Sequence, residues 1–295
     1  MPSTSIRPRR SVLYMPGSNA RALEKGKALP ADALILDLED AVAPDAKEAA
    51  RATVRAALGD KAAYGGRELL VRVNGLDTAW GHGDLVAMAA TGADGILLPK
   101  VDSADMVRRA AGVLEGADGP ADLPIWCMME TPRGVLHAEE IADQPRVAGL
   151  VMGTSDLTKD LTARHTSQRL PMLVSLGTCL LAARAAGIPI LDGVHLDLAD
   201  DADLAASCAQ GRELGFDGKT LIHPKQIEAA NAAFGPSAEE VAWAERIILA
   251  FEEASAAGKG VVLVDGKLVE NLHVAEALRI RALAAMIASA GSGAS

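Results

Sequence analysis

Three carboxylates and one arginine stand at the ends of apolar, strand-like runs and are the residues best placed for chemistry. Glu39 closes the run ALILDLE, and Arg72 lies inside LLVRVNG. Glu130 closes IWCMME, and Asp156 follows GLVMGTS. In an α/β barrel the carboxyl ends of parallel strands meet at one rim, where such barrels hold their active sites. Acids and a guanidinium at a shared rim indicate a hard metal ion that holds an anionic substrate.

Glu130 and Asp156 are the candidate metal ligands, because they end the fifth and sixth predicted strands and would be neighbours on the rim. Mg²⁺ commonly takes one or two protein carboxylates and completes its shell with water and substrate oxygens. Mn²⁺ suits the same oxygen donors. Each acid also has a structural alternative: Asp156 is suited to cap a helix at SDLTKDL, and Glu130 to pair with Arg133 at a helix start.

Arg72 occupies an apolar strand, where a guanidinium is costly unless it is paired or reaches the rim. Glu39 or Asp40, from the preceding strand, would pair with it, and Asp37 is expected to point the same way as Glu39. The functional alternative is a fork for a carboxylate or a developing oxyanion. The two roles are compatible, since a buried acid can orient the fork.

The segment MPGSN, residues 15–19, follows the first apolar run and is a candidate ligand-binding loop. Gly17 permits a tight turn after Pro16, and Ser18 and Asn19 are suited to cap a helix whose N-terminus would attract phosphate. Most loops of this composition are ordinary turns.

Basic side chains around this loop favour a phosphate-bearing ligand, and they are Arg9, Arg10, Arg21 and Lys25. Lys100 follows the fourth run and belongs to the same rim, either as a ligand contact or as one half of an ion pair. His223 ends the eighth run, where it would line the mouth or make a structural hydrogen bond. The histidines form no HExxH motif. The chain also contains no GxSxG elbow, which argues against covalent serine catalysis.

Eight short apolar runs alternate with Ala-rich helical patterns such as DAKEAARATVRAAL, and they predict the elements that position these residues. Near-continuous apolar runs are typical of strands buried on both faces. The alternation favours a (β/α)₈ TIM barrel of the α/β class. A doubly wound sheet is the alternative, but no GxGxxG follows the first run. The runs are residues 11–16, 33–39, 68–74, 95–101, 125–130, 148–153, 188–194 and 218–224.

The pattern changes after Phe234. Ser237 to Glu240 form a capping box for a long helix that would end near Gly258. VVLVDGKLVE predicts a hairpin around Asp265-Gly266, and a last helix begins near Leu272. A lone hairpin is unstable in water, so this tail must pack on its own barrel or on a neighbouring subunit. We predict a catalytic barrel at residues 1–235 and a C-terminal helix-hairpin-helix lid and oligomerisation segment at 236–295.

Composition limits the class of protein. The net charge of −10 argues against a nucleic-acid or membrane-surface partner. No run approaches the roughly 18 apolar residues of a membrane span. Cys127, Cys179 and Cys208 lie far apart in apolar settings, which indicates buried free thiols and a cytoplasmic protein.

The chain resembles the citrate lyase β-subunit-like CoA-ester lyases of the HpcH/HpaI aldolase superfamily, which include malyl-CoA and citramalyl-CoA lyases. The resemblance runs from about Arg9 to the final helix and rests on motifs that stand in that family's order. They are RRSVLYMPGSN, LDLEDAVAPDAK, VRVNG, LLPKV, METPRGV and GTSDLTKDL.

The resemblance implies roles for the rim residues. Glu130 and Asp156 would hold Mg²⁺, Arg72 would bind a small 2-oxo acid and stabilise an enolate, and Glu39 would support the site. CoA would lie across the strand-one loop and the adjoining rim. The substrate contacts are then expected at Pro16, Gly17, Lys25, Lys100, Arg72 and Glu130. Trimers or hexamers are usual in the family, with the lid of one subunit over the next barrel.

One departure affects the reaction. Many members carry a catalytic aspartate in a lid segment resembling GKMIDAP, whereas this chain has GKLVENL, which puts Glu270 at that position. The expected reaction is cleavage or formation of a β-hydroxyacyl-CoA such as malyl-CoA, giving acetyl-CoA or another acyl-CoA and an oxo-acid such as glyoxylate. The alternatives are a (3S)-malyl-CoA thioesterase, and a citrate lyase β subunit that acts on a citryl thioester of an acyl-carrier protein.

Overall fold

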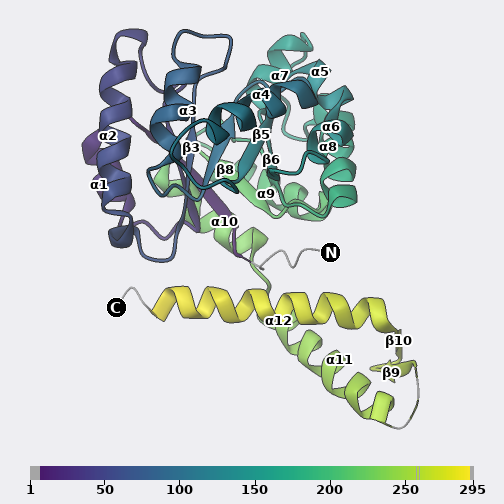
Figure 1. Ribbon diagram of the computed structural model, residues 1–295. Helices are drawn as coiled ribbons and strands as arrows, with labels where there is room; N and C mark the ends of the chain where they lie inside the picture. The colour runs from purple at the N-terminus through teal and green to yellow at the C-terminus, as the bar shows by residue number, and fades with distance from the viewer. Residues whose placement is uncertain (1–6, 257, 259, 293–295) are drawn as a thin grey trace. The chain divides into compact units, whose positions relative to one another are not determined.

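The computed structural model describes residues 7–256, 258 and 260–292. Its contacts divide the chain into two compact units, one spanning Arg9–Phe234 and the other including Gly235–Ser295. We call the second the C-terminal unit. Each unit is described by itself below (Figure 1).

The first unit is a closed barrel of eight parallel strands in sequential order, which confirms the predicted (β/α)₈ fold. Every strand pairs with its sequence neighbours, and β8 pairs with β1 to close the sheet. The strands are β1 Ser11–Pro16, β2 Ala33–Asp37, β3 Glu68–Arg72, β4 Gly95–Leu98, β5 Ile125–Met129, β6 Val147–Met152, β7 Ile190–Asp192 and β8 Gly218–Leu221.

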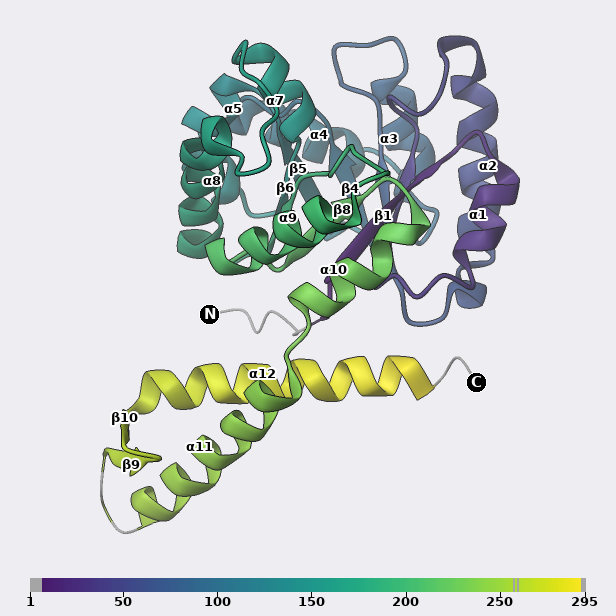
Figure 2. The same cartoon turned by 180° about the vertical axis from the view of Figure 1, so that it is seen from behind.

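Helices follow the strands and surround them, as Figures 1 and 2 show. Several begin at a side-chain cap, such as Asn19 before the first helix and Ser103 before the fourth. The helices are α1 Ala20–Gly26, α2 Lys47–Gly59, α3 Gly81–Ala89, α4 Ala104–Glu115, α5 Pro132–Leu136, α6 Ala138–Ala142, α7 Thr154–Asp160, α8 Leu173–Ala186, α9 Asp201–Leu214 and α10 Ile227–Phe234. Short 3₁₀ turns are η1 Pro44–Ala46, η2 Lys61–Tyr64, η3 Leu170–Met172 and η4 Pro224–Gln226.

The barrel interior is apolar in the middle and ionic at both ends. The middle is filled by residues from alternate strand positions: Val12, Ala33, Ile35, Leu70, Leu97, Trp126, Met128, Val151 and Leu191. At the amino end Arg9 forms a bidentate pair with Glu68 and lies over the Trp126 ring at 5.0 Å from its centroid. Because Trp126 is buried, these side chains close that end of the barrel.

A second apolar layer lies between the strands and the helices. It includes outward-facing strand residues such as Leu13, Leu34 and Leu36, which pack in one cluster with helix residues such as Val54 and Val107. All three cysteines are buried free thiols, as predicted.

The C-terminal unit is a helix, a hairpin and a helix. α11 Ala238–Ala256 begins with the predicted capping box, in which Ser237 and Glu240 exchange side-chain to backbone hydrogen bonds. β9 Val262–Val264 and β10 Lys267–Val269 pair antiparallel, and positive φ values at Asp265 and Gly266 make the connecting turn. α12 Asn271–Ser292 packs against α11.

The described helices include none with the length and apolar character needed to cross a membrane.

Gly149 tests how closely the barrel interior is packed. A Cβ at this position of β6 would collide with the Trp126 ring. We expect Gly149→Ala to lower the free energy of unfolding by about 1–3 kcal/mol, as overpacking does. Urea unfolding followed by circular dichroism measures the change.

The matched control is Gly112→Ala in α4, where the new methyl meets nothing within 4 Å. It should raise the stability by roughly 0.5–1 kcal/mol, because Gly lowers helix stability relative to Ala. Equal effects of the two substitutions would contradict the tight packing around Trp126.

Candidate active site

Arg72 and Asp37 form a buried ion pair at the carboxyl end of the barrel. They are the last residues of β3 and β2 and are register partners. Arg72 Nε and Nη2 each donate to one Asp37 oxygen at 2.6 Å, so the pair is bidentate. Burial opposes the charge of Arg72, but hydrogen bonds to Asp37 and its charge outweigh burial and raise the pKa of Arg72.

The remaining guanidinium nitrogen of Arg72 faces Glu39. Nη1 lies 2.8 Å from Glu39 Oε2 and 3.4 Å from Oδ2 of the exposed Asp40. Glu39 Oε2 is buried and makes no hydrogen bond, so its contact with Arg72 is an ion pair without favourable hydrogen-bond geometry. Burial raises the pKa of Glu39, against the charge of Arg72 and the hydrogen bond from Lys100.

Tyr14 lies beneath this guanidinium. Arg72 Cζ is 4.8 Å from the centroid of the Tyr14 ring, a cation–π contact. The Tyr14 hydroxyl donates to Met128 Sδ at 3.7 Å, and burial raises its pKa. The sequence reasoning did not single out Tyr14, although its place at the fourth position of an apolar strand was a signal.

Lys100 links three acids of the rim. Its backbone N–H donates to Glu130 Oε1 at 2.7 Å. Its ammonium donates to Glu39 Oε1 at 2.7 Å and lies 3.1 Å from Asp156 Oδ2. The backbone of Lys100 has a φ of 50°, a left-handed conformation that is strained for a residue with a side chain. Burial favours a lower pKa for Lys100, but the hydrogen bond to Glu39 and the charges of Glu39 and Glu130 raise it overall.

Glu130 is buried directly after β5, against the chain that leaves β6. A Cβ on Gly153 would collide with the Glu130 side chain, so Gly153 is what makes room for this carboxyl. Burial raises the pKa of Glu130 to about 7, although the charge of Lys100 opposes the shift. Asp156 lies in the first turn of α7 and is partly exposed.

The two helices that follow these acids are capped by other residues. Gly153 holds the N-cap position of α7, and Asp156 comes later, in the first turn. Thr131 caps α5, where its hydroxyl accepts from Gly134 N–H. Both acids therefore stand beside Lys100 rather than serving as helix caps.

We call these six residues, Asp37, Glu39, Arg72, Lys100, Glu130 and Asp156, the rim cluster. Its four carboxylates outnumber its two cations, and an excess of buried negative charge favours a divalent cation. Among the described residues no three His, Cys, Asp or Glu side chains are grouped as a metal site. Glu130 and Asp156 alone still fit Mg²⁺, which often takes two protein carboxylates and leaves other positions to water and substrate.

The loop after β1 is held against β2. Gly17 N–H donates to Asp37 carbonyl at 2.8 Å, and a Cβ on Gly17 would lie 2.6 Å from the same oxygen. Asn19 caps α1 through its side chain, as the sequence predicted. Pro16 ends β1 beside this turn, and Lys25 is exposed on α1.

The interpretation of Arg9 and Arg10 as phosphate contacts near this loop is wrong. Both precede β1 and therefore lie at the amino end of the barrel, where Arg9 pairs with Glu68 and Arg10 with Asp32. Closeness in sequence to a strand does not reveal to which end of that strand a residue belongs.

Two further predicted residues have other surroundings. His223 is exposed and caps η4, accepting from Lys225 N–H at 3.2 Å, so its role is the structural one. Glu270 belongs to the C-terminal unit, where its backbone N–H donates to His273 Nδ1 at 3.0 Å just before α12.

A buried ionic group around Asp192 was missed by the sequence reasoning. Asp192, at the end of β7, accepts from Lys219 Nζ at 2.8 Å and from Arg169 Nη1 at 2.6 Å. Lys219 in β8 is fully buried, and Gln210 holds the Arg169 guanidinium at 2.6 Å. The signal was the charge inside the apolar runs IPILDGV and GKTLIHP.

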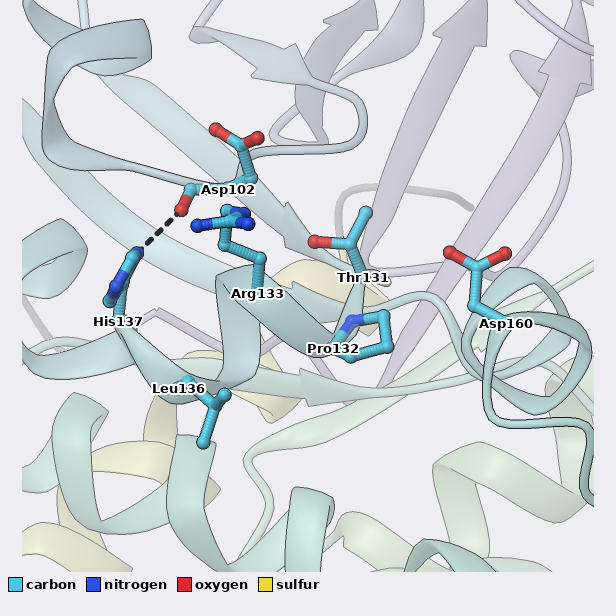
Figure 3. A pocket seen from close by; sticks show the side chains of 7 residues that line it. All are labelled: Asp102, Thr131, Pro132, Arg133, Leu136, His137 and Asp160. Atoms are coloured by element: carbon cyan, nitrogen blue, oxygen red, sulfur yellow. Dashed lines mark hydrogen bonds between the residues drawn. The ribbon is translucent and has the colours of Figure 1, made fainter.

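A pocket of about 480 Å³ lies by the segment that follows Glu130 in the chain, and Figure 3 shows the side chains that line it. It is lined by the β4–α4 loop, the start of α5 and the end of α7, with the residues Asp102, Thr131, Pro132, Arg133, Leu136, His137 and Asp160. His137 Nδ1 bonds to the Asp102 carbonyl at 2.9 Å. No residue of the rim cluster lines this pocket. We take the rim cluster as the candidate active site, because shifted pKa values are typical of functional sites.

Comparisons with known proteins all indicate the same family. The sequence profile of the HpcH/HpaI aldolase/citrate lyase family matches residues 10–224. The chain is 54% identical over 282 residues to a (3S)-malyl-CoA thioesterase of Cereibacter sphaeroides, covering 96% of each chain. It is 38% identical over 271 residues to the citrate lyase subunit beta of Escherichia coli, covering 90% of this chain and 89% of that one.

A solved structure extends the likeness to three dimensions. The protein CitE from Mycobacterium tuberculosis, in complex with magnesium, acetoacetate and coenzyme A, is 31% identical. It superposes with a TM-score of 0.74 and covers 95% of this chain and 99% of that one. A citrate lyase beta subunit from the same organism, complexed with oxaloacetate and magnesium, is 33% identical with a TM-score of 0.66, over 79% of this chain and 98% of that one.

The raised pKa of Glu130 predicts how the stability of the metal-free protein depends on pH. Its pKa is raised from 4.5 to about 7, so the folded state binds a proton more tightly than the unfolded state. Its contribution to stability is therefore present at low pH and is lost as the pH rises towards 7. Glu130→Gln should remove this loss, and should stabilise the protein relative to wild type by up to roughly 3 kcal/mol more at pH 8 than at pH 5.

Urea unfolding of both proteins in EDTA at the two pH values measures the difference. Acidic groups elsewhere titrate alike in the two proteins, so their contributions to the stability difference cancel. A stability difference that does not change with pH would contradict the raised pKa of Glu130.

Proposed function

This chain belongs to the HpcH/HpaI aldolase/citrate lyase family, and on that premise we propose that it hydrolyses the thioester of a β-hydroxyacyl-CoA such as (3S)-malyl-CoA. The observation that carries the proposal is the 54% identity, over 96% of both chains, to a (3S)-malyl-CoA thioesterase. The sequence-based expectation put carbon–carbon cleavage first, and the comparison favours the alternative, hydrolysis.

The rim cluster supports binding of the malyl end of such a substrate. Glu130 and Asp156 would hold Mg²⁺, for which Mn²⁺ is a substitute, and the bound ion would polarise substrate oxygens as a Lewis acid. Arg72 is oriented by its two bonds to Asp37, which leave Nη1 on the side of Glu39 and the exposed Asp40. The substrate's negative charge would replace the weak 3.4 Å contact to Asp40.

Arg72 would then stabilise the negative charge that develops on an oxygen as water attacks the thioester. Glu39 keeps Arg72 and Lys100 in position from the other side. The CoA portion would lie along Pro16, Gly17 and Lys25, where an exposed lysine is available to a phosphate.

Glu270 is proposed as the base, presented by the C-terminal unit as a lid of a neighbouring copy in a trimer or hexamer. The glutamate is longer by one methylene than the aspartate of related lyases, and small displacements of a catalytic group can cost orders of magnitude in rate. A water molecule can adjust its position to the longer side chain, whereas a substrate carbon is fixed. This difference favours hydrolysis over proton transfer at carbon.

Carbon–carbon cleavage is the second candidate, and the identity to citrate lyase subunit beta favours it. The same metal acids and Arg72 would serve, with Arg72 stabilising a thioester enolate and Glu270 returning the proton to carbon. Action on a citryl thioester of an acyl-carrier protein is the form of this reaction that needs a partner protein.

Product analysis separates these reactions. The purified chain with (3S)-malyl-CoA and Mg²⁺ should release malate and one free CoA thiol per turnover, read by a thiol reagent and chromatography. Glyoxylate with acetyl-CoA, and no free thiol, would establish cleavage instead. No turnover of any free CoA ester, with activity on a citryl-carrier thioester, would establish the partner-dependent form.

Three substitutions test the assigned roles at the rim. Glu130→Gln, Asp156→Asn and Arg72→Lys should each lower kcat/KM at least about 100-fold, since each removes charge stabilisation or the bidentate fork. EDTA should abolish activity, and Mg²⁺ or Mn²⁺ should restore it.

The control is Lys61→Met, at the amino end of the barrel, where Lys61 pairs with Asp94. It should retain full activity. Circular dichroism should show that all four variants are folded, and full turnover of wild type in EDTA would refute the metal assignment.

A further inference from the structure

Lys100 occupies an unusual place for a surface lysine. Its ammonium is within 2.7 Å of Glu39 Oε1 and 3.1 Å of Asp156 Oδ2, although about half of its side chain is exposed. Its own backbone N–H holds Glu130 Oε1 at 2.7 Å. One residue thus contacts both candidate metal ligands through different atoms.

The backbone of Lys100 is strained in order to make these contacts. A φ of 50° costs a non-glycine residue roughly 1–3 kcal/mol, and such strain persists where the surroundings over-determine it. Here the hydrogen bond to Glu130 and the two ion pairs of the ammonium fix the residue. The side chain is therefore aimed into the acids rather than lying on the surface by chance.

Charge explains why a cation is needed there. The carboxylates of Glu39, Glu130 and Asp156 come from three different strand ends and meet at Lys100. Arg72 gives two of its nitrogens to Asp37 and only Nη1 to Glu39. Without a further positive charge, the buried carboxylates of Glu39 and Glu130 and the partly exposed Asp156 would face one another as like charges, which is unfavourable.

We propose that the Lys100 ammonium is an internal counter-ion that stands in for the divalent cation and is displaced from Asp156 when the cation binds. The proposal rests on the metal role given above to Glu130 and Asp156. Lys100 is thus a positioning residue with two parts: the ammonium competes with the metal, while the backbone N–H keeps Glu130 in place in both states.

The test is metal binding in the absence of substrate. Lys100→Met removes the ammonium but keeps the backbone N–H that holds Glu130. Mn²⁺ should then bind about tenfold more tightly than to wild type, equivalent to roughly 1.4 kcal/mol. Titration calorimetry and the electron paramagnetic resonance signal of free Mn²⁺ measure the affinity.

Two further variants isolate the effect of the charge at this position. Lys100→Arg keeps a cation and should bind Mn²⁺ with the wild-type affinity within about threefold, a difference of roughly 0.7 kcal/mol. Lys61→Met changes the net charge by the same amount at the far end of the barrel and should leave the affinity unchanged. The metal-free Lys100→Met protein should unfold at a lower temperature than wild type, and saturating Mn²⁺ should raise its midpoint by more than it raises that of wild type.

The outcomes separate failure of this proposal from failure of the metal site. Wild type that binds no Mn²⁺, or that binds it equally well after Glu130→Gln, would refute the metal site itself. If wild type binds Mn²⁺ through Glu130, then unchanged or weaker binding by Lys100→Met would overturn the counter-ion role. Weaker binding would mean that the ammonium organises the ligands rather than competing with the ion.

Discussion

The bidentate pair of Asp37 and Arg72 is the interaction on which the rest of the site depends. A guanidinium at the end of a buried strand would be unstable without a neighbour that neutralises it, and Asp37 does so from the adjacent strand end with two bonds of 2.6 Å. With Nε and Nη2 occupied, Nη1 is the nitrogen that faces Glu39, and it also donates to Met128 Sδ at 3.8 Å. The placement of Glu39 then directs the Lys100 ammonium towards Asp156. Ion pairs between residues at successive strand ends thus fix the positions of the side chains in the site.

Much of the barrel was predictable because strands buried on both faces must be apolar along their whole length, and few other folds repeat such runs eight times. The pairing of Arg72 with acids of the preceding strand was predictable for the same reason, since an arginine in such a run needs a partner. The place of Lys100 was not, because it depends on a left-handed backbone that its sequence context does not encode. The charges of Asp192 and Lys219 inside apolar runs were open to the same reasoning, but the runs do not reveal that Arg169 comes from a distant loop to complete the group.

The two ionic groups of the barrel differ in their balance of charge. Around Asp192, two cations hold one carboxylate between the strands and the outer helices, and Gln210 completes the arrangement. In the rim cluster the acids outnumber the cations, and one of them, Glu130, has its pKa raised to about 7. The first group has one cation more than carboxylates and leaves the buried Nη2 of Arg169 without a hydrogen bond, and the pair of Asp192 and Lys219 links β7 to β8. The second has an excess of negative charge, and shifted pKa values such as that of Glu130 are the usual mark of a functional site.

The filled amino end of the barrel limits where a ligand can enter and leave. Trp126 is buried there, Arg9 lies over its ring and Glu68 pairs with Arg9, so side chains fill the amino end of the barrel. For the reaction proposed above, the acyl chain, water and the metal ion would then all enter and leave at the carboxyl end. Products would therefore have to leave by the opening that the next substrate needs, so product release and substrate binding would exclude one another.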